Sequence, residues 1–245
     1  MDNAMYVGLS RQMVLRRELD IAANNIANSD TAGFKLEDLM LRQDPQGPAK
    51  TGGLIAPVNF VMDAGVARDF TQGQLRDTGA PLDFAIEGQG FFKVVTASGA
   101  ERYTRDGRFK LDPTGKLVTQ DGAAVQGGGG DIVLDPTKGA VSVSEGGVIS
   151  QGGQKVGQID VVRFADLSSL SKDGNNLYRN DTNVAPQPAT DAKIRQGALE
   201  GSNVQPVVQI TRLIELTRAY ENITNLMSQT SDLSRRSIQR LGAVS

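Results

Sequence analysis

Both ends of this chain carry long helical patterns, whereas the residues between them have the pattern of β-structure. Residues 1 to about 29 and about 206 to 241 place apolar side chains three or four positions apart, which is the period of an amphipathic helix. From Thr71 onward, short apolar runs alternate with turn signals every 8 to 12 residues or so, as in an all-β domain. Two helices that must meet across a β domain, or on a neighbouring copy, favour assembly over catalysis.

The composition excludes several classes of function. Lys plus Arg is 26 and Asp plus Glu is 28, a net charge of -2, so no basic excess is available to bind nucleic acid. The chain has no Cys, His or Trp, which removes thiolate nucleophiles, imidazole bases and the usual zinc ligands. The sequence contains no run of about 18 apolar residues, so it predicts no membrane span. The first residues lack the basic and apolar regions of a cleaved signal, so we expect none.

The N-terminal helix ends in an asparagine-rich stretch. Its apolar stripe is predicted to comprise Met5, Leu9, Met13, Leu15, Leu19, Ala22 and Ile26. Asn24, Asn25 and Asn28 disfavour helix because their side chains compete for nearby backbone groups, and Gly33 then permits a positive φ. Two interpretations stay open: these asparagines terminate the helix, or they hydrogen-bond a neighbouring helix or chain.

The C-terminal helix has the seam of a coiled coil. The seam residues are Leu213, Leu216, Tyr220, Ile223, Met227 and Thr230. Pro206 suits a first helical turn, and Ser202 or Asn203 is the candidate cap. Burial along one seam does not offset the entropy of ordering a helix of this length, so we expect both ends to be loosely ordered in the monomer and helical after assembly.

The predicted fold is a mainly β central domain of short antiparallel strands, with terminal α-helices that pair in a coiled-coil-like helical domain. Its predicted parts are a helical assembly domain of residues 1–30 and 206–245, an extended connector of residues 31–70 with at most brief strands, and a β-rich outer domain of residues 71–205. Asp106-Gly107 and Asp121-Gly122 predict tight hairpins. Asp112 to Gly115 predicts a type I turn.

Candidate chemical sites have simpler interpretations. Gly127 to Gly130 lacks the Gly-Lys-Ser/Thr of a phosphate loop, and Gly88-Gln89-Gly90 lacks the third glycine of a dinucleotide site, so a turn and a bend are predicted. Carboxylates that could pair for glycan hydrolysis are Asp83, Glu87, Asp106 and Asp112, of which the last two already have turn roles. We therefore predict no catalytic, cofactor or metal site. A secreted glycan hydrolase and a β-rich binding module remain as alternatives.

Several motifs resemble one family, the rod and hook proteins of the bacterial flagellum. The first is Ala23 to Asn28 followed by Thr31 to Lys35. The others follow in the family's order: Thr71 to Leu75, Pro81 to Phe92, Tyr103 to Gly107, Leu117 to Thr119, Leu199 to Val204, Pro206-Val207 and Arg218 to Glu221. Together they span nearly the whole chain. The compact length and residues 197–204 are most similar to a proximal rod protein, with the distal rod protein as the alternative.

The resemblance implies a mechanical role. Proteins of this family are exported unfolded through the flagellar export apparatus, without a cleaved signal, and their terminal helices form the inner tube of a rod that crosses the periplasm and transmits torque. The implied partners are copies of the chain and other rod proteins. We predict assembly contacts at Leu9, Asn24, Asn25, Asn28, Leu213, Leu216, Tyr220, Ile223 and Met227, with Asn203 shaping the entry to the last helix. Gly33, Gly88, Gly90 and Gly107 are expected to set backbone shape.

Overall fold

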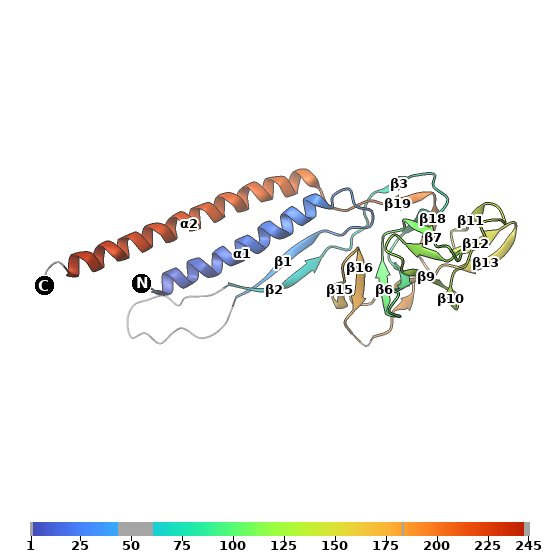
Figure 1. Cartoon of the computed structure of the whole chain (residues 1–245), viewed down its shortest axis with the longest axis horizontal. Helices are drawn as coiled ribbons and strands as arrows, with labels where there is room; N and C mark the ends of the chain where they lie inside the picture. The colour runs from blue at the N-terminus through green and yellow to red at the C-terminus, as the bar shows by residue number, and fades with distance from the viewer. Residues whose placement is uncertain (1, 44–60, 183, 243–245) are drawn as a thin grey trace. The chain divides into compact units, whose positions relative to one another are not determined.

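The chain has a long helix at each end and short strands between them (Figure 1). The structure is a computed structural model that describes residues 2–43, 61–182 and 184–242. The helices are α1 (Asp2–Ala27) and α2 (Pro206–Gly242), and every strand pair among the described residues is antiparallel. The predicted fold class is confirmed, and Pro206 opens α2 as expected. The coiled-coil character of the helix pair stays a prediction.

The chain divides into two compact units. The described parts of residues 1–27, 37–68 and 205–245 form the first, here called the helical unit. Residues 28–36 and 69–204 form the second, the β unit. The chain therefore passes from one unit to the other after residues 27, 36, 68 and 204. These passages differ from the predicted boundaries, because residues 37–43 and 61–68 belong with the helices.

In the helical unit, α1 and α2 lie side by side and antiparallel (Figure 1). Leu15, Ala22 and Leu216 are the buried centre of their contact, and the side chains packed around them are Leu19, Leu213, Ala219, Tyr220 and Ile223. Nearer the start of α1, a Cβ added to Gly8 would lie 3.1 Å from Met227 Cγ. Residue numbers rise along α1 as they fall along α2, which fixes the antiparallel direction.

A strand pair also belongs to the helical unit. Strands β1 (Glu37–Gln43) and β2 (Val61–Arg68) pair from Glu37 opposite Arg68 to Gln43 opposite Val61, with a register shift between Leu39 and Leu41. Both contact α1, and Val14 and Ile21 of α1 are buried. The sequence predicted a connector here because its Pro and Gly residues cluster between positions 45 and 57, which lie outside the described residues. Pairing between distant segments leaves no local signal.

The β unit is built on a ten-stranded sheet with the order β15-β16-β6-β5-β9-β8-β7, to which β10, β14 and β17 are attached. Smaller sheets are β11-β12-β13, β18-β4 and β19-β3. The strands are β3 (Leu75–Asp77), β4 (Phe84–Glu87), β5 (Phe91–Val95), β6 (Glu101–Thr104), β7 (Phe109–Leu111), β8 (Leu117–Thr119), β9 (Ala124–Gly127), β10 (Gly130–Asp131), β11 (Val141–Val143), β12 (Val148–Gln151), β13 (Gln154–Gln158), β14 (Val161–Arg163), β15 (Leu170–Lys172), β16 (Leu177–Asn180), β17 (Gln187–Pro188), β18 (Lys193–Gln196) and β19 (Ala198–Glu200). A 3-10 turn, η1 (Leu167–Ser169), precedes β15.

Two apolar clusters form the core of the β unit. The larger contains Phe84, Ile86, Phe92, Val94, Phe109, Leu117, Val125, Ile149 and Ile159, among others. The smaller is aromatic: Phe91 and Tyr178 meet edge to face with ring centroids 5.8 Å apart, and Phe70 packs against both. Such edge-to-face contacts align the positive ring edge with a negative ring face. The core explains why these short strands hold together.

The predicted turns have different outcomes. The amide of Gly115 donates to Asp112 O at 3.0 Å between β7 and β8, and the Asp121-Gly122 turn joins β8 to β9, so both predictions are confirmed. The predicted hairpin at Asp106-Gly107 is wrong, because β6 pairs with β5 and β16 whereas β7 pairs with β8. Gly107 is needed for a different reason: an added Cβ would lie 1.6 Å from Phe84 O.

We expect Gly107→Ala to destabilise the β unit by about 2–4 kcal/mol, because the backbone of β4 must move to admit a methyl group. Urea unfolding of the purified chain measures the loss. Gly146→Ala is the matched control, since no atom lies within 4 Å of the added Cβ and the residue has no positive φ. Equal midpoints for the two variants would show that the backbone there is more yielding than this contact indicates.

Candidate assembly site

Asn25, near the end of α1, binds the backbone of its own chain. Its side chain is 1% exposed. The amide nitrogen Nδ2 donates to Glu37 O at 2.8 Å, and Oδ1 accepts from Glu37 N at 3.0 Å. A side-chain amide can satisfy both backbone groups of one residue in this way, as a neighbouring strand would. The partner of Asn25 is therefore strand β1 rather than a neighbouring helix.

Charged side chains fasten the same part of the helical unit. Arg68 Nε lies 3.2 Å from Glu37 Oε1, which links β2 to β1. Arg212 of α2 forms an ion pair with Asp38 of β1. Nearer the middle of α1, Arg17 Nε lies 3.7 Å from Asp63 Oδ2 of β2. Each element of the helical unit is thereby tied to another by polar contacts as well as by apolar packing.

Asn28 belongs to the turn that follows α1. Its Oδ1 accepts from Thr31 Oγ1 at 3.2 Å, and its carbonyl accepts from Thr31 N at 3.1 Å. These bonds close the turn locally, which agrees with the helix-terminating interpretation. Asn24 is exposed. The three asparagines therefore have three different surroundings, although they lie within five residues of one another.

A buried ion cluster lies inside the β unit. Glu200 Oε1 is 2.5 Å from Lys35 Nζ, and Glu200 Oε2 is 2.9 Å from the NH1 nitrogen of Arg105. The amide of Gly73 donates to the same Oε1 at 2.9 Å, and Lys35 Nζ also donates to Thr71 O at 2.7 Å. The two ion pairs and these backbone contacts join four separate segments of the chain at one carboxylate.

The electrostatics of this cluster follow from its burial. Lys35 and Glu200 are 1% exposed and Arg105 is 4% exposed. Burial lowers the pKa of Lys35 and of Arg105 from their usual ranges, and the charge of Glu200 opposes both shifts. Two cations bind the same buried carboxylate, and the charge of Asp69 acts on Lys35 as well. Arg105 also donates to Gly88 O at 2.9 Å and lies over the Phe91 ring, 5.4 Å from the ring centroid, whereas its buried Nε has no hydrogen-bond partner among the described residues.

Asn203, three residues before α2, binds the backbone of two distant segments, at Leu36 and at Asp69. Its Oδ1 accepts from Leu36 N and its Nδ2 donates to Asp69 O, both at 2.8 Å. The predicted cap is therefore wrong: Asn203 serves these backbone groups, and Ser202 Oγ accepts from Val204 N ahead of the helix. Asn203 does not cap α2 because its side-chain amide is already hydrogen-bonded to Leu36 and Asp69.

Comparison with known proteins gives matches along most of the chain. Three family models match: "Flagella basal body rod protein" at residues 5–35, "Flagellar hook protein FlgE/F/G D1 domain" at residues 85–151, and "Flagellar basal body rod FlgEFG protein C-terminal" at residues 195–240. The flagellar basal-body rod protein FlgF of Caulobacter vibrioides is 61% identical over 245 residues, with all of both chains covered. This chain belongs to the flagellar basal-body rod protein family.

Other rod proteins are more distant. FlgF of Mesorhizobium japonicum is 36% identical over 250 residues, again with all of both chains covered. The rod protein FlgG of Borreliella burgdorferi is 32% identical over 258 residues, covering 95% of this chain and 96% of its own. The three matched segments of the rod family each contain one member of the ion cluster, namely Lys35, Arg105 and Glu200.

The predicted contact residues divide between two surfaces. Leu216 is buried against α1, and Leu213, Tyr220 and Ile223 pack around it, so these seam residues hold the chain's own helices together. Leu9 is 45% exposed. The predicted stripe on α1 is therefore not one face: Leu15 and Ala22 turn toward α2, whereas Leu9 and Met13 do not, because the spacing from Met13 to Leu15 crosses to another side of the helix.

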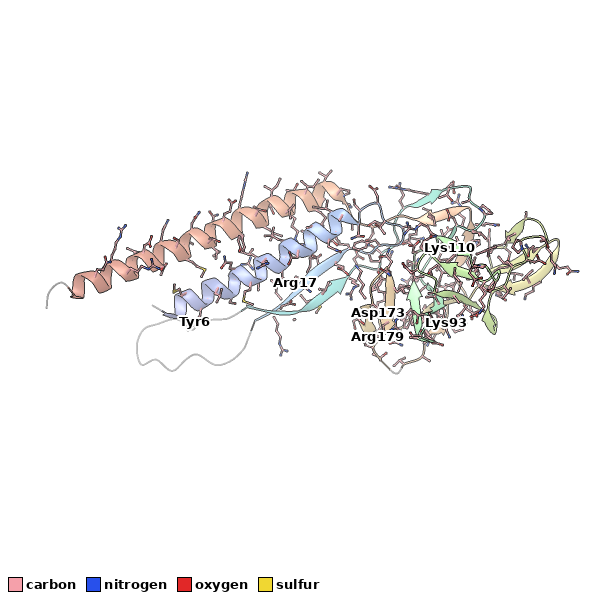
Figure 2. All side chains as sticks on the ribbon, viewed as in Figure 1. Tyr6, Arg17, Lys93, Lys110, Asp173 and Arg179 are labelled. Atoms are coloured by element: carbon pink, nitrogen blue, oxygen red, sulfur yellow. The ribbon has the colours of Figure 1, made fainter. Side chains whose placement is uncertain are left out.

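Two groups of residues were not predicted from the sequence: the buried ion cluster and several exposed apolar side chains of the helices. The ion cluster was not anticipated, although Lys35, Arg105 and Glu200 each stand inside a motif of the resemblance. The exposed apolar side chains Tyr6, Val207, Ile210 and Ile214 were also missed. Tyr6 lies near the N-terminal end of α1 (Figure 2). Their spacing of three and four was the available signal, hidden by the stronger inner seam.

The other predicted positions have structural roles. Gly33, Gly88 and Gly90 adopt positive φ values of +68°, +102° and +153°, which confirms them as backbone-shape positions. Residues 127–130 form the turn between β9 and β10. Among the described residues, no group of three or more acidic, His or Cys side chains could hold a metal ion. No helix in the described ranges is sufficiently long and apolar to cross a bilayer.

The candidate carboxylates have local partners. Asp112 Oδ1 accepts from the amides of Thr114 and Lys116, and its hydrogen bonds, foremost that from the Thr114 hydroxyl, lower the pKa of this carboxyl. A general acid requires the opposite shift. Asp106 binds the Arg108 guanidinium, with its Oδ2 2.6 Å from the nearer nitrogen. Asp83 accepts from the Thr78 hydroxyl at 2.7 Å.

Asn25→Ala should lower the free energy of unfolding of the helical unit by about 1–3 kcal/mol, because two buried backbone groups of Glu37 lose their partner. Thermal unfolding followed by circular dichroism at 222 nm or so reports the change in the helices. Asp20→Ala, at an exposed position of the same helix, is the control and should unfold like the parent chain. A similar loss in both variants would assign the effect to helix propensity instead.

Glu200→Gln should cost about 3–5 kcal/mol, because Lys35 and Arg105 stay buried and lose the carboxylate that they share. Lys35→Met should cost less, since Arg105 and Glu200 remain a neutral pair. The measurement is urea unfolding of each purified variant. Glu145→Gln, which breaks the exposed pair with Lys193, is the control and should leave the midpoint unchanged. If Lys35→Met proved the more damaging change, the Glu200 carboxylate would not be the group on which the cluster depends.

Proposed function

We propose that this chain is a structural subunit of the proximal rod of the flagellar basal body, and that it assembles through its terminal helices into the shaft that transmits motor torque. The observation that carries the proposal is the full-length similarity to FlgF at 61% identity, against 32% for a FlgG protein. The FlgG similarity makes a place in the distal rod the second candidate. The two candidates differ in position along the rod, not in mechanism.

The helices supply the surface that such an assembly requires. On α1, Tyr6, Leu9 and Met13 are 62%, 45% and 66% exposed. On α2, Val207, Ile210 and Ile214 are 77%, 46% and 48% exposed. Contiguous exposed apolar side chains on a soluble chain mark an interaction surface, because burying them releases ordered water. The role inferred from this surface is mechanical rather than catalytic.

The proposal extends to export and location. The subunit leaves the cytoplasm through the flagellar export apparatus without a cleaved signal and acts in the part of the rod that crosses the periplasm. Its partners there are copies of itself and other rod proteins, and it needs neither nucleic acid nor a membrane span of its own. The absence of Cys suits a chain that folds outside the cytoplasm without disulfides.

The terminal helices are proposed to become fully ordered only during assembly. Their mutual contact has only three buried side chains among the described residues, Leu15, Ala22 and Leu216, although α1 has 26 residues and α2 has 37. Packing on other copies would bury the outward residues and complete the stabilisation. Asn24, Asn28 and Met227 stay among the proposed assembly contacts, together with Leu9.

Leu9→Asp should abolish rod assembly while leaving the β unit folded, because a carboxylate cannot enter an apolar contact between subunits without losing its hydration. The readouts are swimming of a complemented deletion strain and the amount of the chain in purified basal bodies. Val156→Asp is the matched control, as Val156 is a similarly exposed apolar residue (41%) in the β unit, and it should swim normally.

The position along the rod needs its own measurement. Immunogold labelling of purified basal bodies should place the chain in the proximal segment. Label in the distal segment would favour the second candidate, and absence from basal bodies altogether would contradict the function itself.

A further inference from the structure

Residues 193–204, here called the strap, are the last segment of the β unit in chain order. They contain β18 and β19, each of which forms a two-stranded sheet with a strand from the early part of the unit: β18 with β4, and β19 with β3 (Figure 1). Between these strands, Gly197 donates to Asp83 O at 2.8 Å, and its carbonyl accepts from Thr78 N at 2.8 Å. The strap therefore supplies the sheet partners of two strands that are synthesised long before it.

Strand β4 is buried, and its main-chain partner is the strap. Phe84, Ala85 and Ile86 are at most 1% exposed. Buried backbone groups need hydrogen-bond partners, and the register places Phe84 opposite Gln196 and Ile86 opposite Ile194. Ile194 also belongs to the larger apolar cluster, together with Phe84 and Ile86. Without the strap, β4 loses its paired strand and the core loses a side chain.

The strap also carries the carboxylate that two buried cations share. Glu200 lies in β19 and forms ion pairs with Lys35 and Arg105. Until this carboxylate is in place, burial of either cation leaves its desolvation cost without compensation from Glu200. The backbone of the strap fits closely at this point, since a Cβ added to Gly73 would lie 2.0 Å from Gly201 O. Earlier segments alone can form neither the ion cluster nor this close approach.

One side chain of the strap links it to a third sheet. The amide nitrogen of Gln196 donates to Pro81 O at 2.8 Å and to Val141 O at 2.9 Å, and its side-chain oxygen accepts from Val143 N at 3.0 Å. Val141 and Val143 lie in β11, so Gln196 joins the β11-β12-β13 sheet to the residues just before β4. The strap is thereby bonded to both the early and the middle parts of the β unit.

We propose that the strap is the closing element of the β unit: it leaves its place only when the whole unit unfolds, and the unit stays open until the strap has been synthesised. Its contacts provide the paired strand of a buried strand, the counter-charge of buried cations and a core side chain, each of which is costly to lose. The opposite case is a strap that detaches from a sheet which stays folded.

For export, this inference rests on the proposed function. A subunit that passes through the export apparatus unfolded benefits when no earlier segment can complete the β unit ahead of the strap. The closing role itself is a property of the isolated chain.

Native-state hydrogen exchange of the purified full-length chain separates the two cases, because each amide reports the opening that exposes it. The strap reporters are the amides of Ile194, Gly197 and Gly201, which donate to Glu145 O, Asp83 O and Gln74 O, each at 2.8 Å. The sheet reporters are the amides of Leu117 and Thr119 in β8, which donate to Ile132 O at 2.9 Å and to Ala123 O at 2.8 Å. The protection factors of the two sets are expected to agree within about tenfold. Strap amides that exchange faster than the sheet amides by more than about tenfold would overturn the proposal.

A pair of variants sharpens this measurement. Glu200→Gln should lower the protection of both sets together, by about a hundredfold, because the strap loses its ion pairs and the unit opens as a whole. Glu145→Gln is the matched control: it removes only the exposed ion pair of the strap residue Lys193 and should change neither set. A loss confined to the strap amides in Glu200→Gln would also contradict the closing role. If Glu200→Gln does not fold, the parent chain alone decides between the two cases.

The result does not depend on where the chain acts in the cell. A strap that opens by itself would leave the proposed function intact and remove the closing role. A chain that is absent from basal bodies would remove the benefit for export, whereas equal protection of strap and sheet would still establish the closing role.

Discussion

A single buried carboxylate, that of Glu200, is the constraint on which the β unit depends. Removing charge from water is costly, and close partners for the charged atoms offset that cost. Glu200 has Lys35, Arg105 and the amide of Gly73 within 3 Å, and its own backbone carbonyl accepts from Gly33 at 2.8 Å. One residue thus joins segments that are up to 165 positions apart along the chain. The β unit can therefore fold only when these segments lie together around the Glu200 carboxylate.

Polar side chains place the chain segments, and apolar side chains supply the surfaces for packing. Asn25 fixes the end of α1 to β1, and Asn203 fixes the residues that lead to α2. The helices retain exposed apolar sides that the other described residues do not cover. This division suits a rod subunit, because its polar contacts are internal and the apolar sides of its helices stay exposed.

Local features were predictable, and features that depend on distant partners were not. The turn at Asp112 was anticipated because its carboxylate binds amides two and four residues away. Asp106-Gly107 has the same local pattern, yet no hairpin forms there, since β6 and β7 find other strands. The connector predicted for residues 31–70 contains β1 and β2 because α1 offers them a surface. Asn25 carries a helix-ending signal in the sequence, but its bond to Glu37 depends on where β1 lies.

By itself, the sequence determined the two helices, the antiparallel β domain between them, the main turns and membership of the rod family, because periodicity, turn residues and ordered motifs are all written along the chain. Only the tertiary structure decided which apolar residues face inward. Leu9 and Leu15 stand in one stripe by spacing, but only Leu15 meets α2. Burial is a property of neighbours in space, and so are the pairing of Lys35 with Glu200 and the exposure of Val207, Ile210 and Ile214.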